Sequence, residues 1–392
     1  MFKQIIAVTG NNLRNLPQRA GLSAVIVVGI AVTVAVLVSV LAMAAGFGHT
    51  LANTGSADRA IVLRGGSQAE LNSTISRDNA LTIMDAPGVR KDGDGKPIAS
   101  AEIVTIVNLL QKKTGTKANV TVRGIGPKGM LLRPEIKLVQ GRMFKPALHE
   151  LIVGKAAVEQ FEGVTLGSRL TFRDADWTIV GVFDSNGDAH ESELIGDAET
   201  LMSAYRRNLF QDIVVQLESP ASFDTFKDAL TTNPTLSVDV KRETDYYAEQ
   251  SKGLSKLLFF VAYVVGGIMA LGAVFGALNT MYSAVSARAM EIATLRAIGF
   301  GALPVVVSVF VEALLLALIG GSVGALAAWL FFNGNTVNTL GGNFSQVVFK
   351  LTVTPALVKS GILWSCVIGV FGGLFPAIRA ARLPVAEALR AT

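Results

Sequence analysis

Few residues in this chain have the types and spacing that catalysis or metal binding requires. The histidines His49, His149 and His190 lie far apart, and none has a second histidine at metal-ligand spacing. Residues 124–129, GIGPKG, lack the Gly-Lys-Ser or Gly-Lys-Thr continuation of a phosphate-binding loop. The sequence therefore predicts no catalytic residue, no metal site and no cofactor bound by this chain. If ATP drives the protein, we expect the ATPase to be another polypeptide.

One acidic run begins like a calcium loop. Asp184, Asn186 and Asp188 alternate as the first ligands of such a loop do. However, Ala189 stands where the loop requires glycine, and Ile195 stands where it requires the final glutamate. We therefore expect no calcium binding at this run.

Glu312 is the one acid inside an apolar stretch long enough to span a membrane. A carboxylate in lipid costs on the order of 2 to 3 kcal/mol or more, so such a residue is a functional-site hypothesis by default. The favoured interpretation is that Glu312 lies near the cytoplasmic interface and pairs with an arginine or with polar groups of a neighbouring helix. The alternative is an ion or proton pathway, although a single acid does not make a relay.

A short charged turn, residues 287–300 (ARAMEIATLRAIGF), lies between two of the longest apolar runs. Arg288, Glu291 and Arg296 are spaced by three and five residues, with apolar residues between them. This pattern predicts a small amphipathic helix on the membrane face. The alternative is a solvated loop whose arginines only set the topology.

The composition indicates spanning helices joined to one sizeable aqueous domain. The chain is 51% apolar and 17% charged, with a mean hydropathy of +0.47. The sequence pI is near 9.3, but residues 49–256 hold 25 basic and 27 acidic residues, so the positive excess flanks the apolar runs. This distribution is typical of a membrane topology signal and predicts no nucleic-acid partner. The single cysteine, Cys366, excludes a disulfide framework.

The fold class predicted from these patterns is an α-helical membrane protein with four transmembrane helices and an α+β extracytoplasmic domain of two lobes. The first apolar run resembles a signal peptide at Ala42, Ala44 and Ala45, but its length favours a retained helix. The predicted segments are an interfacial elbow helix 1–20, span 21–48, outer domain 49–245 with a second lobe inserted at about 149–207, stalk and span 246–287, turn 288–302, span 303–332, outer loop 333–356, span 357–378 and tail 379–392.

Within the outer domain, Val- and Ile-rich runs bounded by turn residues predict strands, and longer mixed runs predict helices. The strands are expected at 59–63, 102–109, 118–125, 151–154, 169–173, 177–183, 212–217 and 236–241, and the helices at 76–84, 156–161, 197–207 and 222–231.

Charge predicts the orientation of the spans. With a cytoplasmic amino terminus, the elbow, the turn and the tail share one side and hold eight basic residues against two acids. These are Lys3, Arg14, Arg19, Arg288, Arg296, Arg379, Arg382 and Arg390 against Glu291 and Glu387. The positive-inside rule then places both termini in the cytoplasm and the aqueous domain outside.

Each of the last three spans carries a GxxxG pair, the spacing that allows helices to approach closely. The pairs are Gly272 and Gly276, Gly320 and Gly324, and Gly369 and Gly373. Together they favour a helix bundle, within one chain or between two copies.

Several of these segments resemble the FtsX/MacB-type permeases of ABC transporters. In the spans the resemblance lies in MEIATLRAIGF, in Glu312, in the cluster Gly320, Gly321 and Gly324, and in the tail PAIRAARLPVAEALR. In the outer domain it lies in APGV at 86–89, LIVGKAAVEQF and WTIVGVFDSNGDAHESELIGDAETL, which are similar to the MacB-type periplasmic core domain. The match covers nearly the whole chain.

The resemblance implies a type VII (MacB/LolC-like) permease of the bacterial inner membrane. It implies a pair of permeases, expected to be a homodimer, bound to two ATPase subunits that hold ATP and Mg. The turn would be a coupling helix seated in a groove of the ATPase, formed by Arg288, Glu291, Leu295, Arg296 and Gly299. Unlike full-length MacB, the sequence shows no fused ATPase domain, so we expect no enzymatic activity of its own.

The resemblance further implies mechanotransmission, in which cytoplasmic ATP hydrolysis moves the outer domains. The cargo would be a hydrophobic or lipid-linked molecule, exported or extracted from the membrane with a periplasmic adaptor or a carrier protein. A regulatory alternative is that the same movement switches a periplasmic partner such as a cell-wall hydrolase.

Overall fold

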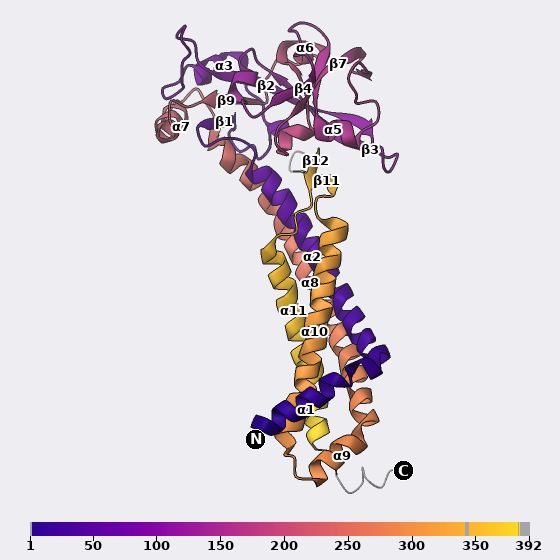
Figure 1. Cartoon of the computed structure of the whole chain (residues 1–392). Coiled ribbons are helices and arrows are strands. Elements are labelled where there is room, and N and C mark those ends of the chain that lie inside the picture. Colours follow the sequence, from indigo (N-terminus) through magenta and orange to yellow (C-terminus); the bar gives the residue numbers. More distant parts are fainter. Residues whose placement is uncertain (1, 342–344, 383, 385–392) are drawn as a thin grey trace. The chain divides into compact units, whose positions relative to one another are not determined.

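The computed structural model describes residues 2–341, 345–382 and 384, which fall into two compact units (Figure 1). The four-helix unit comprises residues up to Ala45, Lys256–Asn335 and the chain from Leu351, and the outer unit comprises Gly46–Ser255 and Thr336–Lys350. Of the predicted tail, residue 383 and residues 385–392, including Glu387 and Arg390, lie outside the described residues.

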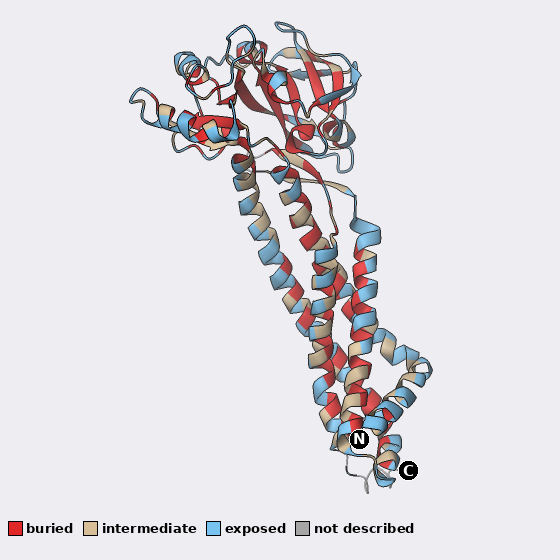
Figure 2. Ribbon diagram, turned by 60° about the vertical axis from the view of Figure 1, so that its left-hand side comes forward, coloured by how far each residue is buried: buried red, intermediate tan, exposed pale blue. Residues whose placement is uncertain are grey.

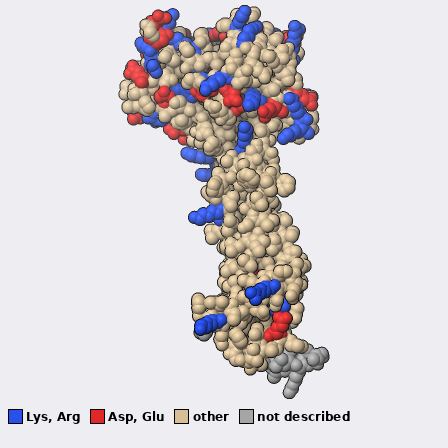
Figure 3. Space-filling view, in the orientation of Figure 1, with Lys and Arg blue, Asp and Glu red and all other residues tan. Residues whose placement is uncertain are grey.

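Within the described residues, four helices are long and apolar enough to cross a membrane, which confirms the predicted fold class. They are α2 (Ala20–Ala52), α8 (Glu243–Ala287), α10 (Ala302–Phe332) and α11 (Pro355–Ala381). The short helices of this unit are α1 (Phe2–Arg14), η1 (Leu16–Arg19) and α9 (Ala289–Ala297). Figure 2 shows the buried residues as stripes along the long helices, and Figure 3 shows an almost uncharged surface between their ends.

Glycines of α10 and α11 allow α10 to pack closely against α2 and against α11. Gly320 and Gly324 face backbone carbonyls of α2, and a methyl group added at Gly320 would lie 2.9 Å from the Val27 oxygen. Gly369 and Gly373 of α11 face the methyl groups of alanines on α10. These contacts exist only because glycine has no side chain to separate the two backbones.

The third glycine pair, Gly272 and Gly276 on α8, has no atom within 4 Å of an added Cβ among the described residues. The apolar side chains around it are exposed, including Ile268 at 66% and Phe275 at 68%. This face of α8 is therefore open in the single chain.

The outer unit is built on one ten-stranded sheet with the order β10-β1-β9-β2-β3-β8-β5-β7-β4, and β6 pairs with β7. The strands are β1 (Arg59–Arg64), β2 (Ala99–Leu110), β3 (Lys117–Ile125), β4 (Lys137–Gly141), β5 (Glu150–Gly154), β6 (Arg169–Phe172), β7 (Ala175–Asp184), β8 (Leu194–Asp197), β9 (Asp212–Gln216) and β10 (Val238–Arg242). All eight predicted strands are present. Two further strands are not predicted from the sequence: β4, a wholly exposed edge strand, and β8, which has only four residues.

Short helices cover this sheet, and side chains that precede α3 and α6 cap these two helices. They are α3 (Arg77–Met84), α4 (Gly129–Leu132), α5 (Lys155–Gln160), α6 (Ala198–Ala204) and α7 (Phe223–Thr231), with single 3₁₀ turns η2 (Glu70–Asn72), η3 (Ala189–Ser192) and η4 (Pro220–Ser222). The Asn79 N–H donates to the Ser76 hydroxyl at 3.2 Å, so Ser76 caps α3 as its position before the helix predicts. The parallel pairing of β3 with β8 makes the two lobes one continuous sheet.

The segment predicted as an outer loop contains a β-hairpin, β11 (Thr336–Leu340) and β12 (Gln346–Lys350), which belongs to the outer unit. The Val348 N–H donates to the Ser192 hydroxyl at 2.9 Å, and the Phe349 ring meets Phe47 edge-on at 5.5 Å. The sequence did not indicate this hairpin within the predicted outer loop, because two five-residue runs carry little local signal and packing on η3 and α2 decides their structure.

Candidate coupling surface and the residues that hold it

The helix α9 occupies most of the predicted turn, and Gly299 ends it. Gly299 has φ +102°, a conformation that costs a residue with a Cβ roughly 1 kcal/mol or more. Its N–H bonds to the Arg296 carbonyl at 3.2 Å, and the next N–H, of Phe300, bonds to the Leu295 carbonyl at 3.1 Å. This pair of bonds is a Schellman motif, so Gly299 sets the end of α9 and the direction in which α10 begins.

A buried ion pair holds the start of α9. Arg288 precedes the helix, and its Nη2 lies 2.5 Å from Glu312 Oε2 on α10, with both residues 4% exposed. Asn12 of α1 completes the site, because its Nδ2 donates to Glu312 Oε2 at 2.8 Å and its Oδ1 accepts from Arg288. The same Nδ2 donates to the Ser308 hydroxyl at 3.1 Å. We call Asn12, Arg288 and Glu312 the polar lock.

The polar lock gives Glu312 the arginine partner that the first interpretation of this residue predicts. It also places Arg288 inside the unit, although the resemblance put this residue on the surface that meets the ATPase. Asn12, which lies 300 residues from Glu312 in the sequence, is not among the predicted site residues. No local signal distinguishes Asn12, because the same helix also carries the amides Gln4 and Asn11.

The other charged residues of the turn, Glu291 and Arg296, contact the ends of η1 and α11. Glu291 is 61% exposed at its side chain and lies 3.4 Å from Arg19 at the end of η1. Arg296 donates from Nη1 to the carbonyl oxygen of Ala381, the last residue of α11. The helix α9 is thus connected by polar contacts to α1, η1, α10 and α11.

The outward side of α9 is short and largely apolar. Met290 is 49% exposed and Ile298 is 67% exposed, with the exposed Thr294 one turn from each. Leu295 is half-buried beside this face. We call Met290, Thr294 and Ile298 the outward face of α9. It has the residue types of a contact surface, since it exposes apolar side chains and presents no nucleophile or base.

A second buried polar cluster lies in the outer unit, around Arg123 on β3. Its guanidinium pairs with Glu70 at 2.9 Å, with Glu102 at 3.1 Å and with Glu193 at 2.8 Å, and all four residues are less than 10% exposed. Burial by itself would raise the pKa of Glu193. The charges of Arg123 and of the adjacent His190 outweigh burial and hold that pKa well below its ordinary value. The cluster links η2, β2 and β3 to Glu193, the residue between η3 and β8.

The first turn of α8 is fixed in the same unit. Glu243 is 1% exposed, and its Oε2 lies 2.5 Å from Arg59 Nε on β1 and accepts from the Ser56 N–H at 3.0 Å. One turn later, the Tyr246 hydroxyl accepts from the Glu70 N–H at 3.2 Å. The start of α8 is therefore part of the core of the outer unit.

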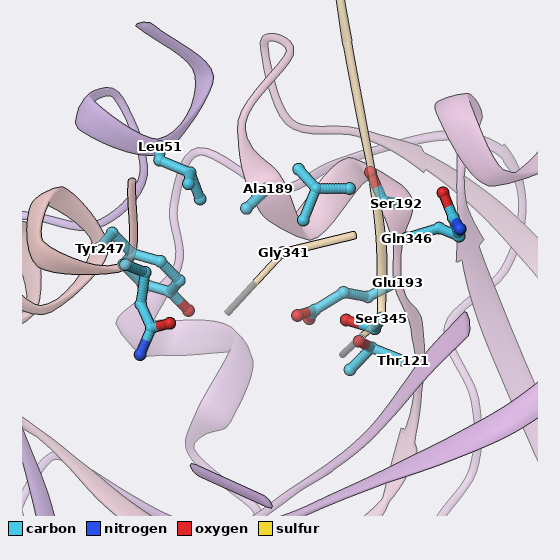
Figure 4. A pocket seen from close by; sticks show the side chains of 11 residues that line it. Leu51, Thr121, Ala189, Ser192, Glu193, Tyr247, Gly341, Ser345 and Gln346 are labelled. Carbon is cyan, nitrogen blue, oxygen red and sulfur yellow. The ribbon is translucent and has the colours of Figure 1, made fainter. Parts of the chain in front are cut away.

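The outer unit also contains a small pocket beneath the β11–β12 hairpin (Figure 4). Its volume is about 30 Å³, and Thr121, Ser192, Glu193 and Tyr247 face it. Glu193 is already bound to Arg123 and His190, so the pocket offers water-sized space and no free acid or base for catalysis. Among residues 2–341, 345–382 and 384, no three His, Cys, Asp or Glu side chains are grouped to hold a metal.

Comparison with known proteins assigns both parts of the chain. Residues 23–233 match the MacB-like periplasmic core domain, and residues 263–385 match the FtsX-like permease C-terminal domain. The chain is 23% identical to the macrolide export ATP-binding/permease protein MacB of Bdellovibrio bacteriovorus, over 95% of this chain and 59% of that protein. It is 24% identical to the ABC transporter permease YknZ of Bacillus subtilis, over 81% of each chain.

The extracellular domain of a YknZ transporter from Gram-positive bacteria gives a TM-score of 0.36 at 17% identity, over 47% of this chain and 99% of that chain. The chain spans about three-fifths of the length of the Bdellovibrio MacB protein and covers only its permease part. The first family match alone covers more than half of the 392 residues. The chain therefore belongs to the FtsX-like ABC transporter permeases that carry a MacB-like periplasmic core domain.

Proposed function

We propose that this chain is the permease subunit that couples ATP hydrolysis by a separate ATPase subunit to movement of its outer domain. The movement exports or extracts a hydrophobic or lipid-linked cargo. ATP and Mg are held by the ATPase, and this chain supplies the contact surface and the lever. The observation that carries the proposal is the outward face of α9 on a helix that the polar lock holds rigidly.

The physical argument begins at α9. A helix whose start is an ion pair buried in its own unit, and whose end is a Schellman motif, resists rotation relative to α10. A load applied to its exposed apolar face is therefore passed to the spanning helices instead of being absorbed by local bending. Movements of packed rigid elements transmit a change between distant sites without any chemistry at the point of contact.

The helices α2 and α8 provide continuity to the outer unit. Each contains residues of the four-helix unit and residues of the outer unit. The buried contacts of Glu243 fix the start of α8 within the outer sheet. A displacement of α8 would then move the sheet as one body, because the Arg123 cluster ties its strands together.

A second copy of the chain is the other partner that we propose. The open Gly272 and Gly276 on α8 supports this, since small residues allow a neighbouring helix to approach closely. A paired arrangement would offer two outward faces of α9 to two ATPase subunits. A periplasmic adaptor or carrier protein would receive the cargo.

The test co-expresses the full chain with its ABC-type ATPase and measures co-purification and ATP hydrolysis in lipid. Ile298→Lys places a charge on the outward face of α9 and should reduce ATPase capture at least tenfold. Ile298→Leu keeps the surface apolar at the same position and should bind normally. Normal capture by Ile298→Lys would refute the coupling surface. Normal capture with ATP hydrolysis, but with no cargo moved and a periplasmic enzyme retained, would favour the regulatory alternative.

A further inference from the structure

The outer unit contains a larger cavity between α3 and α6, both labelled in Figure 1. Its volume is about 310 Å³, which lies at the lower end of the range of small-molecule sites. The cavity exists because β2 turns two alanines, Ala99 and Ala101, to the same side of the sheet. Larger side chains at these two positions would fill it.

Large apolar residues line the walls of this cavity. They include Leu81 and Met84 from α3, Pro127 after β3, and Phe210 before β9. Leu81 is 64% exposed, so one of the larger apolar residues of the site meets solvent at its rim. A concave apolar wall with an exposed apolar rim is the usual setting for the non-polar part of a ligand.

Three charged residues complete the lining, and their net charge is negative. Arg77 is bound to Glu199 by two hydrogen bonds of 2.7 and 2.6 Å, so these two charges neutralise each other. Asp197 is the third. Its Oδ2 accepts from the Thr200 N–H at 2.9 Å, whereas its Oδ1 accepts no hydrogen bond within the described part of the chain. Asp197 Oδ1 is thus free to accept a hydrogen bond from a ligand.

We propose that this cavity binds cationic amphiphiles, molecules with an apolar body and a protonated amine. The apolar body would lie against Leu81, Met84 and Phe210, and the amine would donate to Asp197 Oδ1. The Asp197 carboxylate would repel an anionic ligand, and a neutral ligand would leave this carboxylate without a charged partner. This inference concerns a binding site and does not depend on the ATPase coupling proposed above.

The test compares three small probes of one shape: 4-phenylbutylamine, 4-phenylbutanol and 4-phenylbutanoate. The full chain carries Cys366→Ser to remove its own thiol and Leu81→Cys as a reporter at the rim. The alkylation rate of the reporter with a charged maleimide is measured with each probe at millimolar concentration. The matched control is Leu131→Cys, another exposed leucine of the outer unit, 68% exposed, that does not line the cavity.

The amine should protect the Leu81→Cys reporter and leave the control unaffected. A single favourable charge contact at a solvent-exposed site predicts that the amine binds roughly fivefold more tightly than the alcohol. The anion should bind less tightly than either. Equal protection at both cysteines, no protection at the reporter, or equal affinity for amine and alcohol would each overturn the proposal.

Two charge variants test the assignment to Asp197. Asp197→Asn keeps a residue able to cap α6 and removes the charge, so the preference for the amine over the alcohol should disappear. Adding Glu199→Gln leaves Arg77 as the remaining charge of the lining, so the preference should reverse toward 4-phenylbutanoate. An unchanged preference for the amine in both variants would show that these carboxylates do not select the ligand.

Discussion

The polar lock makes a quantitative prediction about which single change disturbs α9 and which second change restores it. Replacing Glu312 by Leu leaves Arg288 as a buried cation without its acid partner. Breaking a buried ion pair from one side destabilises a protein by about 3 to 5 kcal/mol, because the remaining charge stays desolvated. Both residues are 4% exposed, so solvent cannot take the place of the missing partner. The free energy required to open α9 locally, which exposes Arg288 to solvent, should therefore fall by about 3 to 5 kcal/mol.

The second change is Arg288→Met in the same chain. Replacing a whole buried pair by apolar residues of similar volume is often neutral or stabilising. The double variant Arg288→Met, Glu312→Leu should therefore recover most of the stability that Glu312→Leu loses. Asn12 keeps its contact with Ser308 in both variants.

The assay is hydrogen exchange of the full chain in lipid nanodiscs, read at the amides of α9. Exchange through local opening reports the free energy of that opening. A loss of 3 to 5 kcal/mol corresponds to exchange faster by about 100-fold to several thousandfold in Glu312→Leu, and nearly normal exchange is expected in the double variant. Amides of α7 in the outer unit serve as the internal control. If the double variant exchanged as fast as the single variant or faster, the ion pair would not be what holds α9.

Three further predictions concern the glycines and the buried outer cluster. Gly324→Leu should lower the thermal stability of the solubilised chain, since the new side chain would overlap α2. Gly272→Leu should not, because the surroundings of Gly272 are open. Equal losses of stability in the two variants would contradict this prediction. Gly299→Ala, at φ +102°, should loosen the last turn of α9 in hydrogen exchange, and Gly301→Ala, at φ −68°, should not. Because the folded pKa of Glu193 lies below its ordinary value of 4.5, its stabilising effect is complete above that pH and is lost as the pH falls further. Protection of β3 and β8 amides should therefore decline in acid, and less steeply in Glu193→Gln.

Much of the fold could be predicted from local sequence patterns. Four long apolar stretches predicted the four spanning helices, because a lipid-exposed or helix-packed surface must be predominantly apolar along its length. Short Val- and Ile-rich runs predicted eight strands for the same kind of reason, since one or both faces of each strand are buried. The elements that escaped prediction include α4, β4, β8 and the β11–β12 hairpin. They are short, and their structure depends on strands or helices distant in sequence.

The sequence by itself determined that Glu312 needs a partner, because a carboxylate among apolar residues is costly wherever the chain folds. It also determined that the turn after α8 is charged and favoured a short helix there, with a solvated loop as the alternative. Only the tertiary structure decided that the partners are Arg288 and Asn12 and that Arg288 is inside the unit. It also decided that, among the described residues, the Gly272 and Gly276 pair faces no other helix. The physical reason is that burial and periodicity are properties of neighbouring residues, whereas a specific contact depends on how distant helices pack.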